Sequence, residues 1–323
     1  MAVIQYARQQ GMEVHMSTQT NITNIESVKY YAQYADVMVM ARELNIRQVK
    51  NITDAIVRDN ICGPGGKPVQ VEMFVHGALC MAVSGKCYLS LDLLNSSANR
   101  GACLQPCRRA YSVKDKRDDV ELEIDHEYIM SPKDLKTIDF LDKILKAGVQ
   151  ILKIEGRGRA PEYVKTVVKT YKQAVRAYFN GEFTTDKTTF WTQQLKTVYN
   201  RDFWDGYYLG RRLGEWSQKP GSQATQKKVY IGKITNYFSN KKVVEVAIQT
   251  KDLRLSDNII IIGPTTGVVE TRLDELRVDD RNVDSAIKGE SCSFPVNAMV
   301  RRSDKVYKLL EVDPDSEADA RYQ

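Results

Sequence analysis

The sequence predicts an α/β region built on a parallel sheet, followed by a small all-β barrel domain. Strand-like and helix-like segments alternate from residue 13 to about residue 180. From residue 226 onward, short β-type runs separated by turn residues replace that alternation. A polar segment containing Gly and Pro stands between the two regions, as is typical of a linker. The expected organisation is an α/β region over 1–216, a linker over 217–226, a β-barrel domain over 227–312 and an acidic tail over 313–323.

The α/β region contains four predicted strand–helix units. The expected strands are 13–17, 36–41, 71–77 and 149–155, and the second is almost wholly apolar, as in a buried parallel strand. The expected helices, with apolar residues three and four apart, are 24–34, 45–57, 134–147 and 160–179. Gly148 closes the third helix, and Pro161 stands in the first turn of the fourth. Four units are half of a (β/α)8 barrel, so the region is either an open α/β sheet or a barrel without its first half.

The β region contains five short runs rich in β-branched and aromatic residues, at 228–238, 242–249, 258–262, 267–273 and 290–296. Turn residues such as Gly263 and Pro264 separate them. This pattern favours a closed barrel. The acidic tail has too few apolar residues to fold and is expected to be disordered.

Composition narrows the class of protein. The chain has 323 residues, of which 42% are hydrophobic and 27% charged, as in globular proteins. It contains no apolar run of membrane-spanning length, and its first residues do not resemble a secretory signal. The cytoplasm is therefore the expected compartment, where cysteines are reduced thiols, metal ligands or catalysts instead of disulfides.

The net charge of +6 is concentrated in residues 157–220, which hold twelve basic and six acidic residues. Aromatic residues are interleaved with these charges. The combination suits phosphate neutralisation and base stacking, which would indicate an RNA-binding surface. The alternative is a solvated amphipathic helix whose aromatic residues belong to the core.

Four of the six cysteines fall within twenty-eight positions, with the spacing Cys80-x6-Cys87-x15-Cys103-x3-Cys107. Groups of four thiolates suit zinc or an iron–sulfur cluster. Structural zinc normally uses two short pairs, and only the second pair has that spacing. An iron–sulfur cluster is therefore favoured, with zinc and unliganded thiols as alternatives. The other two cysteines, Cys62 and Cys292, are expected to be unliganded.

The region around these cysteines resembles the collagenase-like peptidase family, whose catalytic mechanism is unassigned. The motifs that carry the resemblance are Glu72-x-Phe74-x-His76-Gly77-Ala78-x-Cys80, Ser84-Gly85-x-Cys87, Asn99-Arg100-Gly101-x-Cys103-x-Gln105-x-Cys107-Arg108 and Leu152-Lys153-Ile154-Glu155-Gly156-Arg157. The resemblance extends over nearly the whole chain, and members of the family begin several strands earlier. It therefore implies a partial TIM-type barrel, the second half of a (β/α)8 fold. Its exposed sheet edge would be covered by a partner or by a second copy in a homo-oligomer.

The C-terminal β domain makes the chain similar to one branch of this family, the prephenate-dependent tRNA uridine hydroxylases. That resemblance implies a [4Fe-4S] cluster on Cys80, Cys87, Cys103 and Cys107, with tRNA and prephenate as partners and hydroxylation of the wobble uridine as the reaction. The alternatives are a collagenase-like peptidase and a non-catalytic remnant that binds RNA. The chain has neither a Gly-x-Ser-x-Gly elbow nor a His-Glu-x-x-His zinc helix, although a dyad of Cys80 and His76 stays open.

Other site residues are expected at the carboxyl ends of the strands, where parallel barrels hold their active sites. The predicted catalytic residues are His76, Glu155 and Arg157. The predicted substrate-binding residues are Gln19, Asn21, Arg42, Glu43, Arg100 and Arg108. Arginines at these ends suit a dicarboxylate, which they bind in a bidentate manner. The alternatives are structural ion pairs for Arg42–Glu43 and Glu155–Arg157, and a buried, hydrogen-bonded role for His76.

Overall fold

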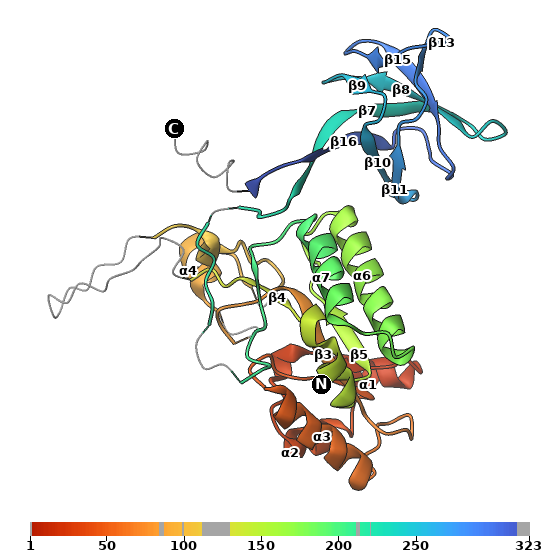
Figure 1. The fold of residues 1–323 in the computed structure, drawn as a ribbon. Coiled ribbons are helices and arrows are strands. Elements are labelled where there is room, and N and C mark those ends of the chain that lie inside the picture. Colours follow the sequence, from red (N-terminus) through yellow and green to blue (C-terminus); the bar gives the residue numbers. More distant parts are fainter. Residues whose placement is uncertain are drawn as a thin grey trace, which may run out of the picture. The chain divides into compact units, whose positions relative to one another are not determined.

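The computed structural model describes residues 2–83, 87–98, 100–111, 130–210, 214–219 and 221–314. The chain divides into two compact units (Figure 1). Unit 1 comprises 1–157, 167–193 and 200–222, and unit 2 comprises 158–166, 194–199 and 223–323. The motif residues Ser84, Gly85 and Asn99, and the tail from residue 315 onward, lie outside the described residues.

A six-stranded sheet forms the centre of unit 1. Its strands are β1 (His15–Met16), β2 (Val37–Val39), β3 (Gln70–Ala78), β4 (Asp134–Lys136), β5 (Ile151–Ile154) and β6 (Phe203–Trp204). The order is β1-β2-β3-β4-β6, and β5 also pairs with β3. The pairs β1–β2, β2–β3 and β3–β5 are parallel, as the sequence predicts for its four strands. β3, almost wholly buried, therefore contacts three neighbouring strands.

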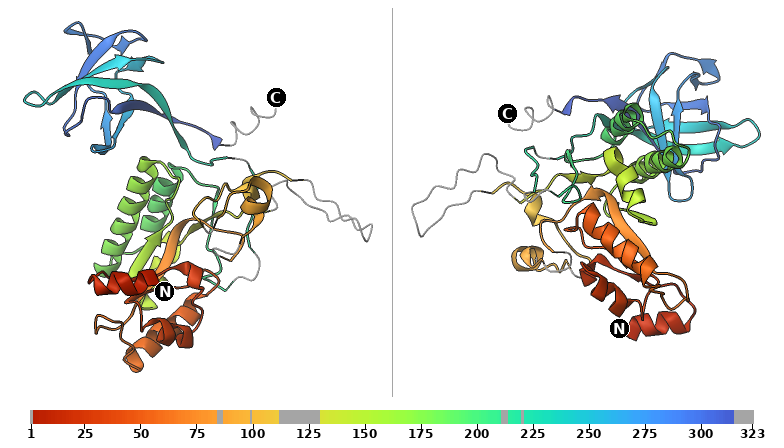
Figure 2. Two further views of the ribbon diagram at one scale, coloured as in Figure 1. Left: turned by 180° about the vertical axis from the view of Figure 1, so that it is seen from behind. Right: turned by 60° about the horizontal axis from the view of Figure 1, so that its bottom comes forward.

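The helices of this part of the chain are α1 (Ala2–Gln9), α2 (Ile25–Tyr31), α3 (Ile46–Arg58), α4 (Leu89–Leu94), α5 (Leu141–Lys146), α6 (Pro161–Phe179) and α7 (Thr185–Lys196). Side chains at the N-cap positions determine where two of them begin. Asn24 caps α2, and Asn45 forms a reciprocal capping box with Gln48 at the start of α3. α6 begins at Pro161. Proline has no backbone N–H, and in the first turn of a helix that group would have no partner within the helix. Figure 2 shows α6 and α7 lying side by side.

The helix predicted over 134–147 is wrong in its first half. Residues Asp134–Lys136 form strand β4, a short 3-10 turn η3 (Ile138–Phe140) follows, and helix α5 begins only at Leu141. The backbone of β4 pairs with both β3 and β6, so two strands satisfy groups that a helix would bond internally. The predicted end is confirmed, because Gly148 follows with a φ of 84°.

The half-barrel expected for unit 1 is not confirmed. β4 runs antiparallel to β3, whereas the strands of a (β/α)8 barrel are all parallel. Unit 1 is therefore a mixed α/β fold with a parallel sheet at its centre. Among the described residues, no helix combines the length and apolar character needed to cross a bilayer.

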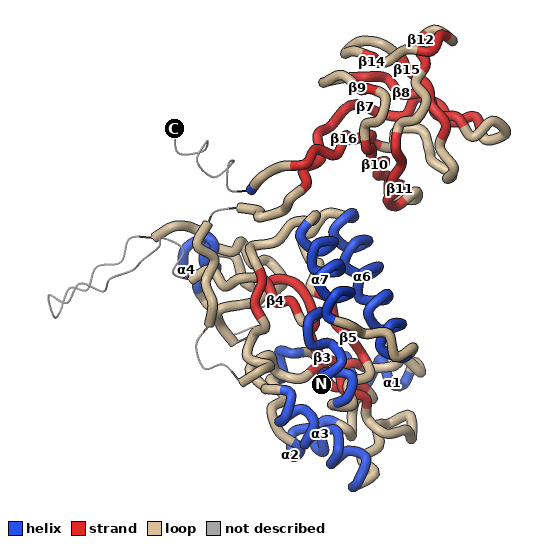
Figure 3. The backbone as a smooth tube through the Cα atoms, in the orientation of Figure 1, coloured by secondary structure: helices blue, strands red, loops and turns tan. Residues whose placement is uncertain are grey.

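Unit 2 contains an antiparallel β domain, shown as strands and loops in Figure 3. Its strands are β7 (Gln226–Phe238), β8 (Val243–Ile248), β9 (Leu253–Arg254), β10 (Asn258–Gly263), β11 (Gly267–Arg272), β12 (Arg277–Val278), β13 (Arg281–Asn282), β14 (Ser285–Ala286), β15 (Ser291–Pro295) and β16 (Lys305–Glu311). All five predicted runs are strands. The eight-stranded sheet runs as an open series β11-β10-β16-β7-β8-β15-β12-β13, so barrel closure is not confirmed. Alternating side chains of β7, β8 and β15 fill its core.

Candidate functional site

The carboxyl ends of β1, β2 and β3 meet at a small pocket in unit 1. The residues that line it are Thr18, Asn21, Arg42, Glu43, Leu79, Cys80, Ala82 and Tyr207. Each strand therefore contributes the residues that follow it, as expected of a parallel sheet. Four predicted site residues, Asn21, Arg42, Glu43 and Cys80, come together here.

Arg42 is the cation of this pocket. Its guanidinium carbon lies 4.1 Å from the centre of the Phe74 ring, a cation–π contact. Its Nε atom is buried and has no hydrogen-bond partner among the described residues. A buried donor without an acceptor is destabilising, so the position favours a ligand that supplies one. The alternative role for Arg42 and Glu43 was a structural ion pair. No ion pair joins these two side chains in the described part of the chain.

Aromatic residues after β6 complete the wall, and the sequence analysis did not assign them to the site. Tyr207 lines the pocket and packs edge-on against Trp204, with ring centres 5.3 Å apart. Tyr208 donates a hydrogen bond of 2.9 Å to the Phe74 carbonyl, and burial raises the pKa of its hydroxyl well above the usual range. The available signal was the aromatic run itself, which we interpreted as an RNA-binding feature.

Of the thirteen aromatic residues in 157–220, five are buried, two are exposed and the others are partly buried. Tyr163, Tyr171, Trp191 and Tyr208 are all less than 5% exposed, whereas Phe179 and Phe190 are exposed. This agrees with the alternative of an amphipathic helix that buries its aromatic face. Few aromatic rings of 157–220 are therefore exposed for the base stacking that the RNA-binding prediction requires.

His76 lies within β3 and is 1% exposed. Its ring centre is 5.6 Å from those of both Tyr171 and Phe203, and its Nδ1 lies 3.5 Å from the Tyr171 hydroxyl. This is the environment of a buried, hydrogen-bonded histidine, the alternative that the sequence left open. Cys80, in contrast, is exposed.

Glu155 and Arg157 follow β5. The backbone N–H of Glu155 donates to the His76 carbonyl at 2.8 Å, and its carboxylate accepts from the backbone N–H of Arg157 at 2.9 Å. The Arg157 guanidinium donates to the carbonyl of Gly101. Arg157 therefore links the end of β5 to the cysteine loop, which we define as residues 80–107.

The four thiols of the cysteine loop differ in exposure, and the other three contribute to the raised pKa of Cys107. Cys80 and Cys103 are exposed, and Cys87 and Cys107 are partly buried. Burial is the main cause that raises the pKa of Cys107, and Arg108 opposes it. The thiols of Cys80, Cys103 and Cys87 each raise that pKa further. The donor chemistry fits an iron–sulfur cluster, although no three Cys, His, Asp or Glu side chains among the described residues are arranged to hold a metal ion.

The remaining predicted substrate-binding residues lie elsewhere. Gln19 and Arg100 are exposed and do not line the pocket. The guanidinium of Arg108 donates to the carbonyls of Leu79 and Pro132, both at 2.6 Å, and to the Ser131 hydroxyl at 3.1 Å. Three of its five N–H donors are therefore used by protein acceptors, and substrate binding by Arg108 stays a prediction.

The sequence analysis gave no site role to Glu72, a buried carboxylate on β3. Glu72, whose side chain is 6% exposed, lies between two basic residues from other strands. Its Oε2 is 3.0 Å from Nδ1 of His15 on β1, and its Oε1 is 2.8 Å from Nζ of Lys153 on β5. Glu72 belongs to a motif quoted above, but only strand pairing brings it together with His15 and Lys153.

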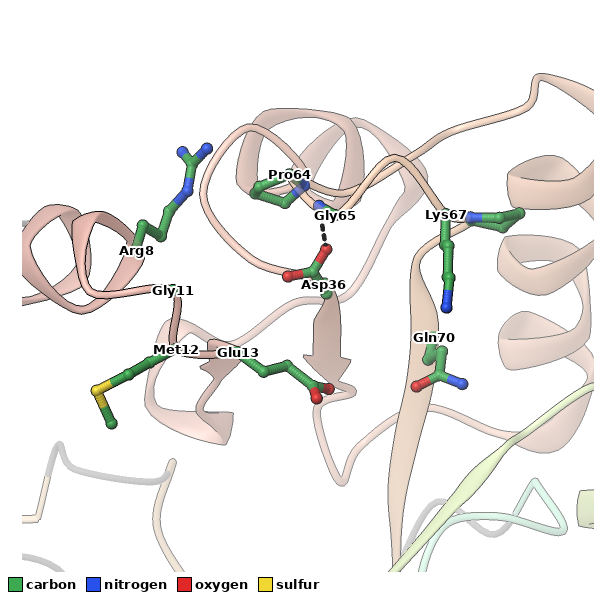
Figure 4. Close-up of a pocket in the computed structure, with 10 residues that line it drawn as sticks. Arg8, Gly11, Met12, Glu13, Asp36, Pro64, Gly65, Lys67 and Gln70 are labelled. Atoms are coloured by element: carbon green, nitrogen blue, oxygen red, sulfur yellow. Dashed lines mark hydrogen bonds between the residues drawn. The ribbon is translucent and has the colours of Figure 1, made fainter.

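A second pocket lies at the amino ends of the same strands (Figure 4). Glu13, Asp36 and Gln70 stand just before or at the starts of β1, β2 and β3, and Arg8 and Lys67 add positive charge. The Asp36 carboxylate accepts a hydrogen bond of 2.8 Å from the Gly65 N–H, which holds the turn after α3. None of the predicted site residues lines this pocket.

The parallel strand ends, the arginine-containing pocket and the four-thiol loop together define a candidate enzyme site on an α/β scaffold. The model of Peptidase family U32 matches residues 1–218, and the chain belongs to this family. The resemblance inferred from the motifs is therefore confirmed.

Three relatives show the range of names within it. A "Collagenase" of Porphyromonas gingivalis (strain ATCC BAA-308 / W83) is 56% identical over 309 residues, 96% of this chain and 75% of that protein. The "tRNA hydroxylation protein P1" of Bacillus subtilis is 33% identical over 85% of this chain and 64% of that protein. The "23S rRNA 5-hydroxycytidine C2501 synthase" of Escherichia coli is 37% identical over 63% of this chain and 30% of that protein.

Proposed function

We propose that this chain is an iron–sulfur enzyme that hydroxylates RNA, with tRNA as its substrate. The observation that carries the proposal is the set of four cysteines within twenty-eight positions, the first of which, Cys80, lines the pocket. These four cysteines would hold a [4Fe-4S] cluster. Such a cluster supplies electron transfer, which a hydroxylation needs and which protein side chains do not provide.

We propose prephenate as the co-substrate, with one carboxylate docked in the pocket, whose volume of about 20 Å³ has room for a single small group. Arg42 offers a buried Nε donor that lacks an acceptor, as a carboxylate would provide. Asn21 and Tyr207 add polar side chains to the same wall. The Phe74 ring beneath Arg42 fixes the plane of the guanidinium and so orients its donors.

An RNA substrate is supported by charge and by the relatives. Residues 157–220 hold twelve basic and six acidic residues, an excess that suits a phosphate backbone. Two relatives carry names that refer to the hydroxylation of tRNA or of 23S rRNA. Binding that rests on phosphate neutralisation weakens steeply as salt concentration rises.

The test begins with the purified protein. Iron and sulfide are measured per chain after anaerobic purification, for the wild type and for Cys→Ser variants at each of the four positions. Cys62→Ser is the matched control, because Cys62 lies outside the cysteine loop. Nucleoside analysis of tRNA from a deletion strain, complemented with each variant, then measures 5-hydroxyuridine. Iron content that is unchanged in the four variants, or 5-hydroxyuridine that persists in the deletion strain, contradicts the proposal.

The second candidate is a collagenase-like peptidase. One observation favours it: the relative that is 56% identical carries the name collagenase. A cysteine peptidase would use the exposed thiol of Cys80 in the pocket. It would then need Cys80 but not Cys87, Cys103 or Cys107. Gelatin hydrolysis that is lost in Cys80→Ala and retained in Cys103→Ala would establish this reading against ours.

A further inference from the structure

One side chain joins the two ends of the cysteine loop. Arg108 directly follows Cys107, the last of the four cysteines, and Leu79 directly precedes Cys80, the first. Nη2 of Arg108 donates to the Leu79 carbonyl at 2.6 Å. A hydrogen bond of this length from a charged donor is strong, so the entry and exit of the loop are held against each other.

The same guanidinium also attaches the loop to the sheet. Nη1 of Arg108 donates to the Pro132 carbonyl at 2.6 Å and to the Ser131 hydroxyl at 3.1 Å. Ser131 and Pro132 stand directly before β4, which pairs with β3 at the residues that precede Leu79. Arg108 therefore connects three segments: the exit of the loop, its entry and the start of β4.

A second arginine, which lies just before β6, supports this contact. Nη2 of Arg201 donates to the side-chain oxygen of Gln105 at 3.3 Å, within the loop, and its Nη1 lies 3.6 Å from the Asp134 carboxylate. The Asp134 side chain is 1% exposed. The segment from Gln105 to Arg108 is therefore held by two cations, and Asp134 balances part of their charge.

We propose that Arg108 is the positioning residue that closes the cysteine loop by holding its entry, its exit and the segment before β4 together; the benefit to a cluster rests on the proposed function. Closing a loop of this length costs conformational entropy, which the three hydrogen bonds offset. The planar guanidinium directs donors toward acceptors on two sides, and a lysine ammonium has no such fork. This role accounts for an arginine next to Cys107 without a contact to substrate.

The first test uses the full chain without a cluster, so it does not depend on the proposed function. Alkylation of each cysteine is followed by mass spectrometry for the wild type, for Arg108→Ala and for the matched control Arg109→Ala, whose side chain is exposed. Because Arg108 also lowers the pKa of Cys107, the rates are measured over a pH series and expressed per thiolate. In Arg108→Ala we expect this rate for Cys107 to be about fivefold higher or more, because opening the loop exposes a partly buried thiol. An unchanged Cys107 rate in a folded Arg108→Ala protein overturns the proposal.

Ser131→Ala is a milder variant that guards against loss of the fold. It removes one of the three acceptors and leaves both carbonyl contacts, so Cys107 should react faster than in the wild type and more slowly than in Arg108→Ala. Near-UV circular dichroism compares the folds of all variants. A Ser131→Ala protein that is folded, paired with an Arg108→Ala protein whose Cys107 rate matches the control, contradicts the closure role.

The second test measures cluster retention. After anaerobic reconstitution, a chelator is added and the loss of the cluster absorbance is timed, with the electron paramagnetic resonance signal of the reduced protein as a spectroscopic check. We expect release about tenfold faster in Arg108→Ala than in Arg109→Ala, with Arg108→Lys between them. Equal release rates overturn the proposal. A wild type that takes up no cluster overturns the proposed function instead, and the alkylation test then still decides loop closure.

Discussion

Arg42 and Phe74 form a cation–π pair, with the guanidinium carbon of Arg42, which follows β2, 4.1 Å from the centre of the Phe74 ring in the middle of β3. On the opposite neighbouring strand, Nζ of Lys153 lies 5.4 Å from the same ring. The ring therefore receives one cation from the segment after β2 and one from β5. Glu72 neutralises Lys153, whereas no carboxylate pairs with Arg42 among the described residues. The positive charge available for a ligand is therefore that of Arg42.

Arg42→Gln should weaken prephenate binding by about tenfold to a hundredfold, because a hydrogen bond to a charged group contributes about 1.5–3 kcal/mol. Arg42→Lys should lie between, since lysine keeps the charge but not the bidentate fork. Isothermal titration calorimetry of the anaerobic protein measures the dissociation constants. Arg47→Gln on α3, an exposed arginine, serves as the control. Equal affinity in Arg42→Gln and Arg47→Gln would remove Arg42 from the site.

Glu72→Gln should destabilise the protein by about 1–2 kcal/mol, less than the 3–5 kcal/mol typical of a broken buried ion pair. The destabilisation is smaller because the two partners of Glu72 are partly exposed: the side chains of His15 and Lys153 are 45% and 36% exposed, so water can solvate them once the carboxylate is removed. Urea unfolding measures the free energy. Glu26→Gln breaks only a surface pair with Lys29, so its effect should stay below about 0.5 kcal/mol. A Glu72 variant as stable as the Glu26 variant would refute the account.

Cys292 should resist alkylation in the folded protein, whereas Cys80 and Cys103 should react. Cys292 is 1% exposed, and burial raises the pKa of its thiol to about 12. At about pH 8 roughly one molecule in ten thousand then carries the thiolate. The folded state favours the protonated thiol, so the unfolding free energy should fall as pH rises from 9.0 toward about 12. Cys292→Ala should lack this alkaline loss. Rapid native-state labelling of Cys292 would contradict the burial.

Gly232→Ala should destabilise the β domain by about 2–4 kcal/mol, because the added atom has no room. A Cβ at Gly232 would lie 1.9 Å from the carbonyl oxygen of Ala247, which belongs to the neighbouring strand backbone. Gly214→Ala is the matched control, since its Cβ would meet only side-chain atoms at 3.5 Å or more. Thermal unfolding of the full chain compares the two. Similar melting temperatures for the two variants would show that β7 and β8 can move apart at Gly232 without a loss of stability.

Local signals in the sequence located much of the scaffold. Apolar periodicity located α2 and α3, and the apolar run 71–77 located β3. These features depend on residues a few positions apart, which the chain itself brings into contact. The strand Lys305–Glu311 was not predicted, although it lies between β10 and β7, because its pattern acquires meaning only from those two partners.

The sequence by itself determined the family and the chemical character of the cysteine loop, because motif spacing and composition are properties of the chain. The two units do not follow the predicted boundary, since 158–166 and 194–199 belong to unit 2. Tertiary structure decided three further points. Residues 134–136 are a strand because β3 and β6 offer hydrogen bonds there. Arg108 donates to Leu79, Ser131 and Pro132, which lie far from it in the sequence. Glu72 meets His15 and Lys153 across three strands. Each depends on groups far apart in sequence, whose approach follows from strand pairing and burial, and no local pattern encodes that approach.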